Sequence, residues 1–306
     1  MSRTSKRLLP PPLAKGETLG IFAPAGPIVD QEAFANGVKM LKELGFALRF
    51  QRGLESRNKG YLAGHDEERA KEIMDLWRDP EVKGLVAARG GYGSLRLLDL
   101  LDFNLIATMP KRLIGFSDLT VLHAAILKKT KQLTLHGPMV ATLPKSDPAS
   151  VDSFVQALTN RLPEAIKVKE LEILRGENAS GPLIGGNLTN LAHLIGTPWE
   201  PEWQGAILLL EDIGEAPYRI DRMLHHLKSS GRLDQVAGLI LGTFTDCGDT
   251  ETIWNLALDL TKERVIPLWA NFPSGHGNRN LTLPLGAEVT LDSNKGALRI
   301  EQPANG

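Results

Sequence analysis

A single serine stands where an apolar run gives way to a helical pattern, which is a position from which a nucleophile can act. The run "RLIGF" ends at Phe116, Ser117 follows, and Leu119 and Leu122 begin a helical spacing. Nucleophilic serines often occupy such strand-to-helix turns, in the pattern G-x-S-x-G. Here Gly115 precedes the serine, but leucine stands two positions after it, so the pattern is incomplete. These residues alone therefore favour a helix N-cap without chemistry over a nucleophile.

A glycine-rich stretch, "VAARGGYGSL", follows an apolar run of the kind found in buried strands. The N–H groups of Gly90 and Gly91, together with that of Asp118, can stabilise the charge of a tetrahedral intermediate. A phosphate cradle is the alternative use, but the third glycine of G-x-G-x-x-G is missing after Gly91 and Gly93. The stretch therefore favours an oxyanion site over a nucleotide site.

Carboxylates lie at the end of another apolar run, in "LLLEDIGEAPYRIDRML". Glu211 and Asp212 end the run and Glu215 lies in the turn beyond it, where a carboxylate can orient a histidine. The alternative is that these acids cap the next helix or pair with Arg219 and Arg222. The pattern alone leaves both interpretations open.

One of the seven histidines, His276, lies in a loop between two glycines, in "SGHG". Loop residues on a rigid scaffold are disproportionately functional. The other histidines show no zinc-protease spacing and no obvious chemical partner, although two of them, His65 and His136, have positions from which they could line a cleft. No cluster of cysteine and histidine has metal-ligand spacing, so no metal or other cofactor is expected.

The composition indicates a soluble globular protein of 306 residues, with 42% hydrophobic residues. The 35 lysines and arginines nearly balance 36 aspartates and glutamates, which favours neither a nucleic-acid nor a membrane partner. Prolines interrupt the basic start before an apolar core of signal-peptide length appears. The single cysteine, Cys247, has no motif that would activate it and fits a reducing compartment, so we expect an inert thiol and a cytoplasmic protein.

Short apolar runs alternate with helical patterns along the first half of the chain, which predicts a parallel sheet with crossover helices. Helices are expected over residues 31–44, with Asp30 as N-cap, and 67–78, with Asp66 in the same role. Further helices are expected near 217–229 and 250–263, within a second α/β unit. The pattern weakens between the first half of the chain and this second unit. This suggests a boundary near residue 164, giving domains 1–164 and 165–306.

From "GIFAPAGP" to "TLPLGA", the sequence resembles the murein LD-carboxypeptidases, a serine peptidase family. The matching motifs occur in order as "ARGGYGS", "IGFSD", "HGP", "IGGNLT", "LEDIGEAPYRIDRML", "LGTFTDC" and "SGHG". The resemblance implies a flavodoxin-like N-terminal domain, a smaller C-terminal α/β domain, a homodimer, and a catalytic triad of Ser117, Glu211 and His276. It also implies a cytoplasmic enzyme that cleaves the L,D-peptide bond of peptidoglycan tetrapeptides and releases D-alanine through an acyl-enzyme.

Two questions stay open after this resemblance. A carboxypeptidase must bind a free carboxylate, and Arg89 and Arg279 are candidates by position, although structural pairing explains either equally well. The same family includes immunity-type hydrolases of toxic peptidyl- or aminoacyl-nucleotides, which share the triad and carry insertions for nucleotide stacking. A non-catalytic binding module and a nucleotide-dependent oxidoreductase are the alternatives from other classes.

Overall fold

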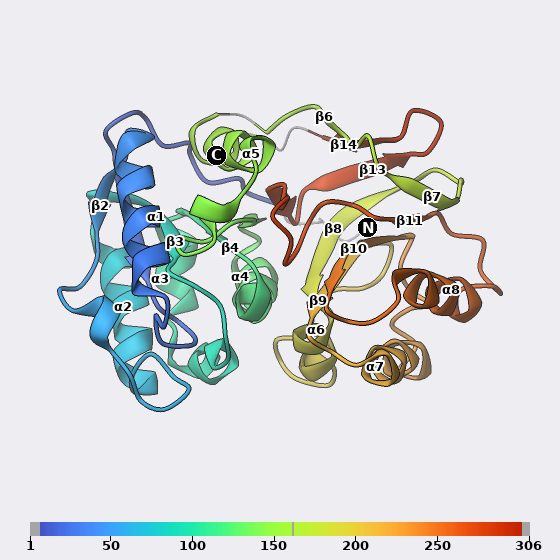
Figure 1. The fold of residues 1–306 in the computed structure, drawn as a ribbon, viewed down its shortest axis with the longest axis horizontal. Coiled ribbons are helices and arrows are strands. Elements are labelled where there is room, and N and C mark those ends of the chain that lie inside the picture. Colours follow the sequence, from blue (N-terminus) through green and yellow to red (C-terminus); the bar gives the residue numbers. More distant parts are fainter. Residues whose placement is uncertain (1–6, 161, 302–306) are drawn as a thin grey trace.

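The computed structural model describes residues 7–160 and 162–301, and their strands form two sheets that lie beside each other (Figure 1). The first sheet has six strands in the order β12-β5-β4-β3-β1-β2. Its strands are β1 (Thr18–Phe22), β2 (Ala47–Arg49), β3 (Val82–Ala87), β4 (Arg112–Gly115), β5 (Thr134–His136) and β12 (Leu283–Leu285). The first five are parallel and have the order 2-1-3-4-5 of flavodoxin-like sheets, which confirms the predicted fold class.

Helices cover both faces of the first sheet, because neighbouring residues of a buried strand point to opposite sides. Ile21 of β1 belongs to the same core cluster as residues of α1 and α5, whereas Phe22 belongs to a second cluster with residues of α2, α3 and α4. The helices are α1 (Gln31–Glu43), α2 (Asp66–Arg78), α3 (Phe103–Thr108), α4 (Thr120–Thr130) and α5 (Pro148–Thr159). The sheet is therefore the middle of three layers, as expected for parallel strands.

The starts of the first two helices follow from their sequences, with one correction. Asp30 accepts a hydrogen bond from the N–H of Ala33 at 2.9 Å, which confirms it as the N-cap of α1. Asp66 is the first residue of α2 and not its cap; the preceding N–H, that of His65, donates to the Glu68 carboxylate at 2.9 Å. The acidic first turn still complements the helix dipole.

The second sheet has eight strands in the order β6-β14-β13-β8-β9-β10-β11-β7. The four strands from β8 to β11 are parallel, and antiparallel strands flank them on both sides. The strands are β6 (Ala165–Lys167), β7 (Glu172–Arg175), β8 (Ala179–Asn187), β9 (Ile207–Ile213), β10 (Gly238–Thr245), β11 (Leu268–Ala270), β13 (Glu288–Asp292) and β14 (Ala297–Ile300).

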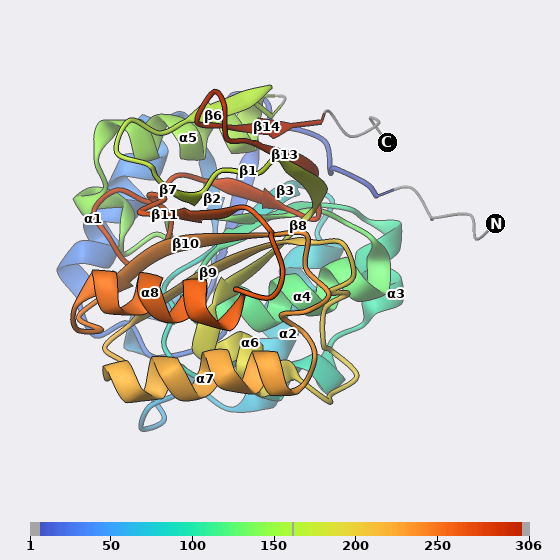
Figure 2. The same ribbon diagram turned by 90° about the vertical axis from the view of Figure 1, so that its right-hand side faces the viewer.

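Three helices lie on one face of this second sheet, and Figure 2 shows α7 and α8 below it. They are α6 (Leu188–Leu194), α7 (Pro217–Ser229) and α8 (Thr250–Leu260). Leu208 and Leu210 of β9 pack into the core between the sheet and these helices. Ile207 and Leu209 point to the other face and belong to the cluster shared with the first domain. The helices predicted near 217–229 and 250–263 are confirmed, and the central strand β9 is buried on both faces of the second sheet.

The two domains share elements as well as a core. The predicted division at residue 164 falls just before β6, yet the first sheet takes one strand, β12, from beyond it. β12 pairs antiparallel with β5, and Leu283 lies opposite His136. The polypeptide therefore enters the second domain and returns to the first, which places the loop before β12 between the two sheets.

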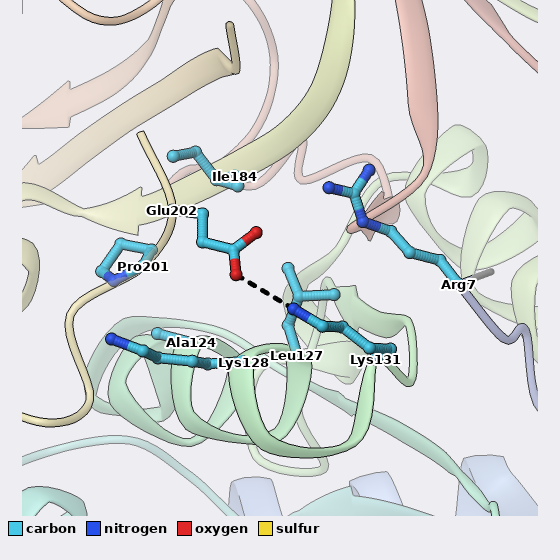
Figure 3. A pocket seen from close by; sticks show the side chains of 8 residues that line it. All are labelled: Arg7, Ala124, Leu127, Lys128, Lys131, Ile184, Pro201 and Glu202. Atoms are coloured by element: carbon cyan, nitrogen blue, oxygen red, sulfur yellow. Dashed lines mark hydrogen bonds and ion pairs between the residues drawn. The ribbon is translucent and has the colours of Figure 1, made fainter. Parts of the chain in front are cut away.

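A small pocket of about 20 Å³ lies on another part of this boundary, beside α4 (Figure 3). Three cations line it, and each has a partner: Arg7 pairs with Glu288, Lys128 donates to the Glu200 carbonyl, and Lys131 lies 3.0 Å from the Glu202 carboxylate. Two of these cations, Arg7 and Lys131, are paired with carboxylates of the second domain, so the side chains around the pocket link the two domains. In the part of the chain that the structure describes, no helix has the length and apolar character needed to cross a bilayer.

Candidate active site

Ser117 lies on a tight turn between β4 and α4 and has an unusual backbone conformation. Its φ of 65° is left-handed, which is uncommon for a residue other than glycine. It begins a short 3-10 helix, Ser117–Leu119, that runs into α4, but its side chain makes no capping hydrogen bond there. The N-cap interpretation of Ser117 is therefore wrong. Strained serines of this kind are typical of nucleophile turns.

Ser117 and His276 line the same open cleft, of about 280 Å³. Three more of the residues singled out in the sequence line it as well: Arg89, Gly90 and Gly91. The cleft is otherwise lined by Ile28, Val29, Asp30, Ala33, Phe116, Met139, Ala141 and Thr142. Apolar walls with a few converging polar groups are typical of a small-molecule site.

His276 is held in place by the carboxylate of Glu211. Nδ1 of His276 lies 2.6 Å from Oε2 of Glu211, which is fully buried on β9. The ring of Phe116, the residue before Ser117, packs against the imidazole with 4.7 Å between ring centroids. Because Nδ1 is occupied by the carboxylate, the Nε2 of His276 is the nitrogen left for chemistry in the cleft.

Gly275 allows this close approach. Its φ is +125°, and a Cβ at this position would lie 2.7 Å from Oε2 of Glu211 and 2.5 Å from Oγ1 of Thr243. The loop is anchored on both sides of the histidine, since Thr243 N–H donates to the Ser274 carbonyl and Thr245 Oγ1 donates to the His276 carbonyl. The glycine noted beside His276 in the sequence thus makes room for the carboxylate.

Glu211 is ionised despite its burial. Burial raises the pKa of a carboxylic acid, but here the positive charge and hydrogen bonding of His276, with a contribution from His136, outweigh it and lower the pKa to about 2. A carboxylate whose charged form is favoured in this way can stabilise an imidazolium on His276.

The glycine stretch lies against the turn that carries Ser117. A Cβ on Gly90 would come within 3.0 Å of Ser117 Oγ, so glycine leaves the space beside the hydroxyl free. The carboxylate of Asp118 accepts a hydrogen bond from the Ser94 N–H at 2.7 Å and ties the turn to the stretch. Burial raises the pKa of Asp118. Among the described residues, the N–H groups of Gly90, Gly91 and Asp118 have no hydrogen-bond partner.

The two candidate arginines have different surroundings. Arg89 is partly buried in the cleft, where burial lowers its pKa, and its guanidinium donates to the Pro27 carbonyl at 2.8 Å. Arg279 lies 2.8 Å from the Glu170 carboxylate and 3.6 Å from that of Asp147, and it is not among the residues that line the cleft. For Arg279 the structure therefore shows the pairing that the sequence left as an alternative.

The other acids and the cysteine have structural surroundings. Asp212 is buried and accepts hydrogen bonds from Asn187 Nδ2 and from the N–H and hydroxyl of Thr189. Glu215 pairs with Arg219 at 3.4 Å. Cys247 is buried, and burial raises the pKa of its thiol, as expected of an inert residue. No group of three potential metal ligands occurs within residues 7–160 and 162–301.

His136 is the residue that sequence reasoning missed. It was expected to have no obvious chemical partner, but it is fully buried at the end of β5, with Nε2 4.0 Å from Oε1 of Glu211. The signal in the sequence was its place at the end of the strand that follows α4, since neighbouring parallel strands end at the same edge of a sheet.

Comparison with known proteins identifies the family. Residues 19–137 match the family model of the LD-carboxypeptidase N-terminal domain, and residues 180–291 match that of the LD-carboxypeptidase C-terminal domain. A Bacillus subtilis protein named as a probable murein peptide carboxypeptidase is 36% identical, over 95% of this chain and 94% of its own. The Microcin C7 self-immunity protein MccF of Escherichia coli is 32% identical, over 97% of both chains.

Solved structures agree with these matches. The muramoyltetrapeptide carboxypeptidase of Oxalobacter formigenes has a TM-score of 0.80 and 33% identity, covering 94% of this chain and 99% of its own. MccF in complex with glutamyl sulfamoyl guanosine has a TM-score of 0.88 and 29% identity, covering 97% of this chain and 100% of its own. With matching domains in order and relatives of this identity along nearly the whole length, the chain belongs to the LD-carboxypeptidase family of peptidases.

Proposed function

We propose that this protein is a serine LD-carboxypeptidase that releases the terminal D-alanine from peptidoglycan-derived tetrapeptides. The observation that carries the proposal is the placement of Ser117 and His276 in one cleft, with Glu211 2.6 Å behind the histidine. The names of the Bacillus subtilis relative and the Oxalobacter formigenes structure support the substrate class.

In the proposed mechanism His276 accepts the proton of the Ser117 hydroxyl while Oγ attacks the carbonyl of the residue before D-alanine. Glu211 stabilises the imidazolium that forms. The N–H groups of Gly90, Gly91 and Asp118 receive the oxyanion. When the intermediate collapses, His276 gives the proton to the leaving amine of D-alanine, and water then hydrolyses the acyl-enzyme by the same route in reverse.

Arg89 is the proposed ligand of the substrate's terminal carboxylate. It lines the cleft, and its guanidinium donates to a carbonyl oxygen, so no protein carboxylate of the described chain neutralises it. An arginine presents two parallel donors to a carboxylate, which suits an exopeptidase that reads a free chain end. We also propose a cytoplasmic homodimer, as the family resemblance implies.

Hydrolysis of peptidyl- or aminoacyl-nucleotides is the second candidate, since the fold is close to that of MccF bound to a sulfamoyl nucleoside. The length of the chain argues against it. The alignment with MccF extends over 335 residues, against 304 for the Bacillus subtilis relative, so MccF carries insertions that this chain of 306 residues lacks. We therefore favour the tetrapeptide as substrate.

The test is to incubate the protein with L-Ala-γ-D-Glu-meso-diaminopimelate-D-Ala, without added metal, and to follow D-alanine release by mass spectrometry. We expect release by the wild type and a loss of about 10³-fold or more in Ser117→Ala, as in other triads. Ser180→Ala, on an exposed part of β8, is the matched serine control. Equal release by Ser117→Ala would overturn the nucleophile, whereas no release by folded wild type would shift the substrate to peptidyl-adenylates.

A further inference from the structure

Glu211 lies between two imidazoles, of which the triad uses one. Its Oε2 is bound by His276, but its other oxygen, Oε1, has no hydrogen-bond partner among the described residues. The buried Nε2 of His136 also has no partner there, and it lies 4.0 Å from this same Oε1. An unpartnered donor and an unpartnered carboxylate oxygen that face each other inside a protein are each costly, and pairing them removes both costs.

We propose that His136 is a positioning residue that binds the second carboxylate oxygen of Glu211 and so aims the first at His276. The inference rests on the proposed function, because it assigns a role within the same site. Contraction of the 4.0 Å gap by about 1 Å would form an ordinary N–H···O hydrogen bond.

The proton on His136 is directed by its other neighbour. Ser274 Oγ lies 3.2 Å from Nδ1 of His136, and both side chains are fully buried. When the hydroxyl donates to Nδ1, the neutral ring carries its proton on Nε2, the atom that faces Glu211. Ser274 thus selects the tautomer that can hold the carboxylate.

The arrangement also connects the elements that make up the site. His136 ends β5 in the first sheet, Glu211 lies on β9 in the second sheet, and Ser274 precedes the loop that carries His276. The ring of Phe116, next to Ser117, lies 5.8 Å from His136 and 4.7 Å from His276, measured between centroids. A shift of β5 relative to β9 would therefore change the distance between His136 and Glu211.

The experiment compares His136→Met, which has no donor, with His136→Gln, whose amide reaches to the position of Nε2 and restores one. Two readouts need no peptide substrate. One is the rate at which a fluorophosphonate probe labels Ser117, with loss of fluoride, and the other is the proton NMR resonance of His276 Nδ1–H, which reports its hydrogen bond to Glu211. His123→Met removes another fully buried histidine, bonded to the Gly115 carbonyl instead of Glu211, and is the matched control for the resonance.

We expect His136→Met to label about tenfold more slowly or worse, the usual cost of removing a group that orients a catalytic residue, with a shifted or broadened His276 resonance. His136→Gln should recover most of the rate and the resonance. In peptide assays the loss should appear in kcat and not in KM.

A wild-type rate and resonance in folded His136→Met would overturn the proposal, and so would a His136→Gln as slow as His136→Met. If His136→Met does not fold, Ser274→Ala is the deciding variant, because it removes the hydroxyl that selects the His136 tautomer and leaves the imidazole ring in place. An unchanged His276 resonance and labelling rate in Ser274→Ala would then overturn the positioning role of His136. If the wild-type protein reacts with the fluorophosphonate probe but releases no D-alanine, the proposed substrate is refuted and the inference about His136 still holds.

Discussion

Arg89 and Arg279 differ in whether a protein carboxylate already binds the guanidinium. It lies in the cleft without a carboxylate partner among the described residues, whereas Arg279 is engaged by Glu170 and Asp147. We expect Arg89→Met to raise KM for the tetrapeptide about tenfold to a hundredfold, since a hydrogen bond to a charged group contributes about 1.5–3 kcal/mol. Steady-state kinetics on the purified variant measures this change.

Arg279→Met is the matched comparison for this experiment. A KM that rises in Arg279→Met and stays at the wild-type value in Arg89→Met would contradict the assignment of the carboxylate site. Because neither guanidinium belongs to the proposed triad, kcat separates a binding defect from a loss of chemistry.

A hydrogen bond connects two elements beside the cleft, the turn that carries Ser117 and the glycine stretch. Asp118 follows Ser117, and its buried carboxylate accepts the Ser94 N–H at 2.7 Å. In Asp118→Ala this N–H loses its partner, which costs about 1–3 kcal/mol. We expect faster hydrogen exchange at the Ser94 amide and a kcat lower by about tenfold to a hundredfold, less than the loss of an oxyanion donor itself.

Asp118→Asn is the control for this prediction, because its amide oxygen still accepts the Ser94 N–H while the charge is removed. It should keep slow exchange and most of kcat. If Asp118→Ala exchanged as slowly as the wild type at Ser94, the two segments would not depend on this hydrogen bond.

At the scale of the whole molecule, acid stability depends on a histidine that the fold keeps neutral. His123 on α4 is fully buried, and burial lowers its pKa from 6.5 to about 3. Nε2 donates to the Gly115 carbonyl at 2.9 Å, and Nδ1 has no partner among the described residues, so a second proton would find no acceptor. The unfolded chain therefore binds this proton first, and stability falls as the pH drops from 6.5 towards 3.

We expect His123→Gln to reduce the slope of the unfolding free energy against pH in this window by up to about 1.4 kcal/mol per pH unit. Urea unfolding at several pH values measures the slope. His193→Gln, the same substitution at an exposed histidine, provides the control. An unchanged slope in His123→Gln would show that His123 takes up its proton in the folded state.

The features that depend on neighbours along the chain could be predicted from the amino-acid sequence. The alternation of apolar runs and helical patterns predicted the parallel sheets, and Asp30 marked the start of α1, because periodicity and capping are local properties. The family resemblance, carried by motifs that include those around Ser117 and His276, singled out two residues that line the same cleft.

The contacts between residues far apart in the sequence follow from the three-dimensional structure. It returned β12 to the first sheet, engaged Arg279 in ion pairs, and placed His136 beside Glu211 across the boundary of the two sheets. No periodicity encodes these contacts, because they arise when two separately patterned domains bury their apolar faces against each other. The local pattern thus specifies what each segment forms, and the packing of the two domains specifies which polar groups are left to face each other.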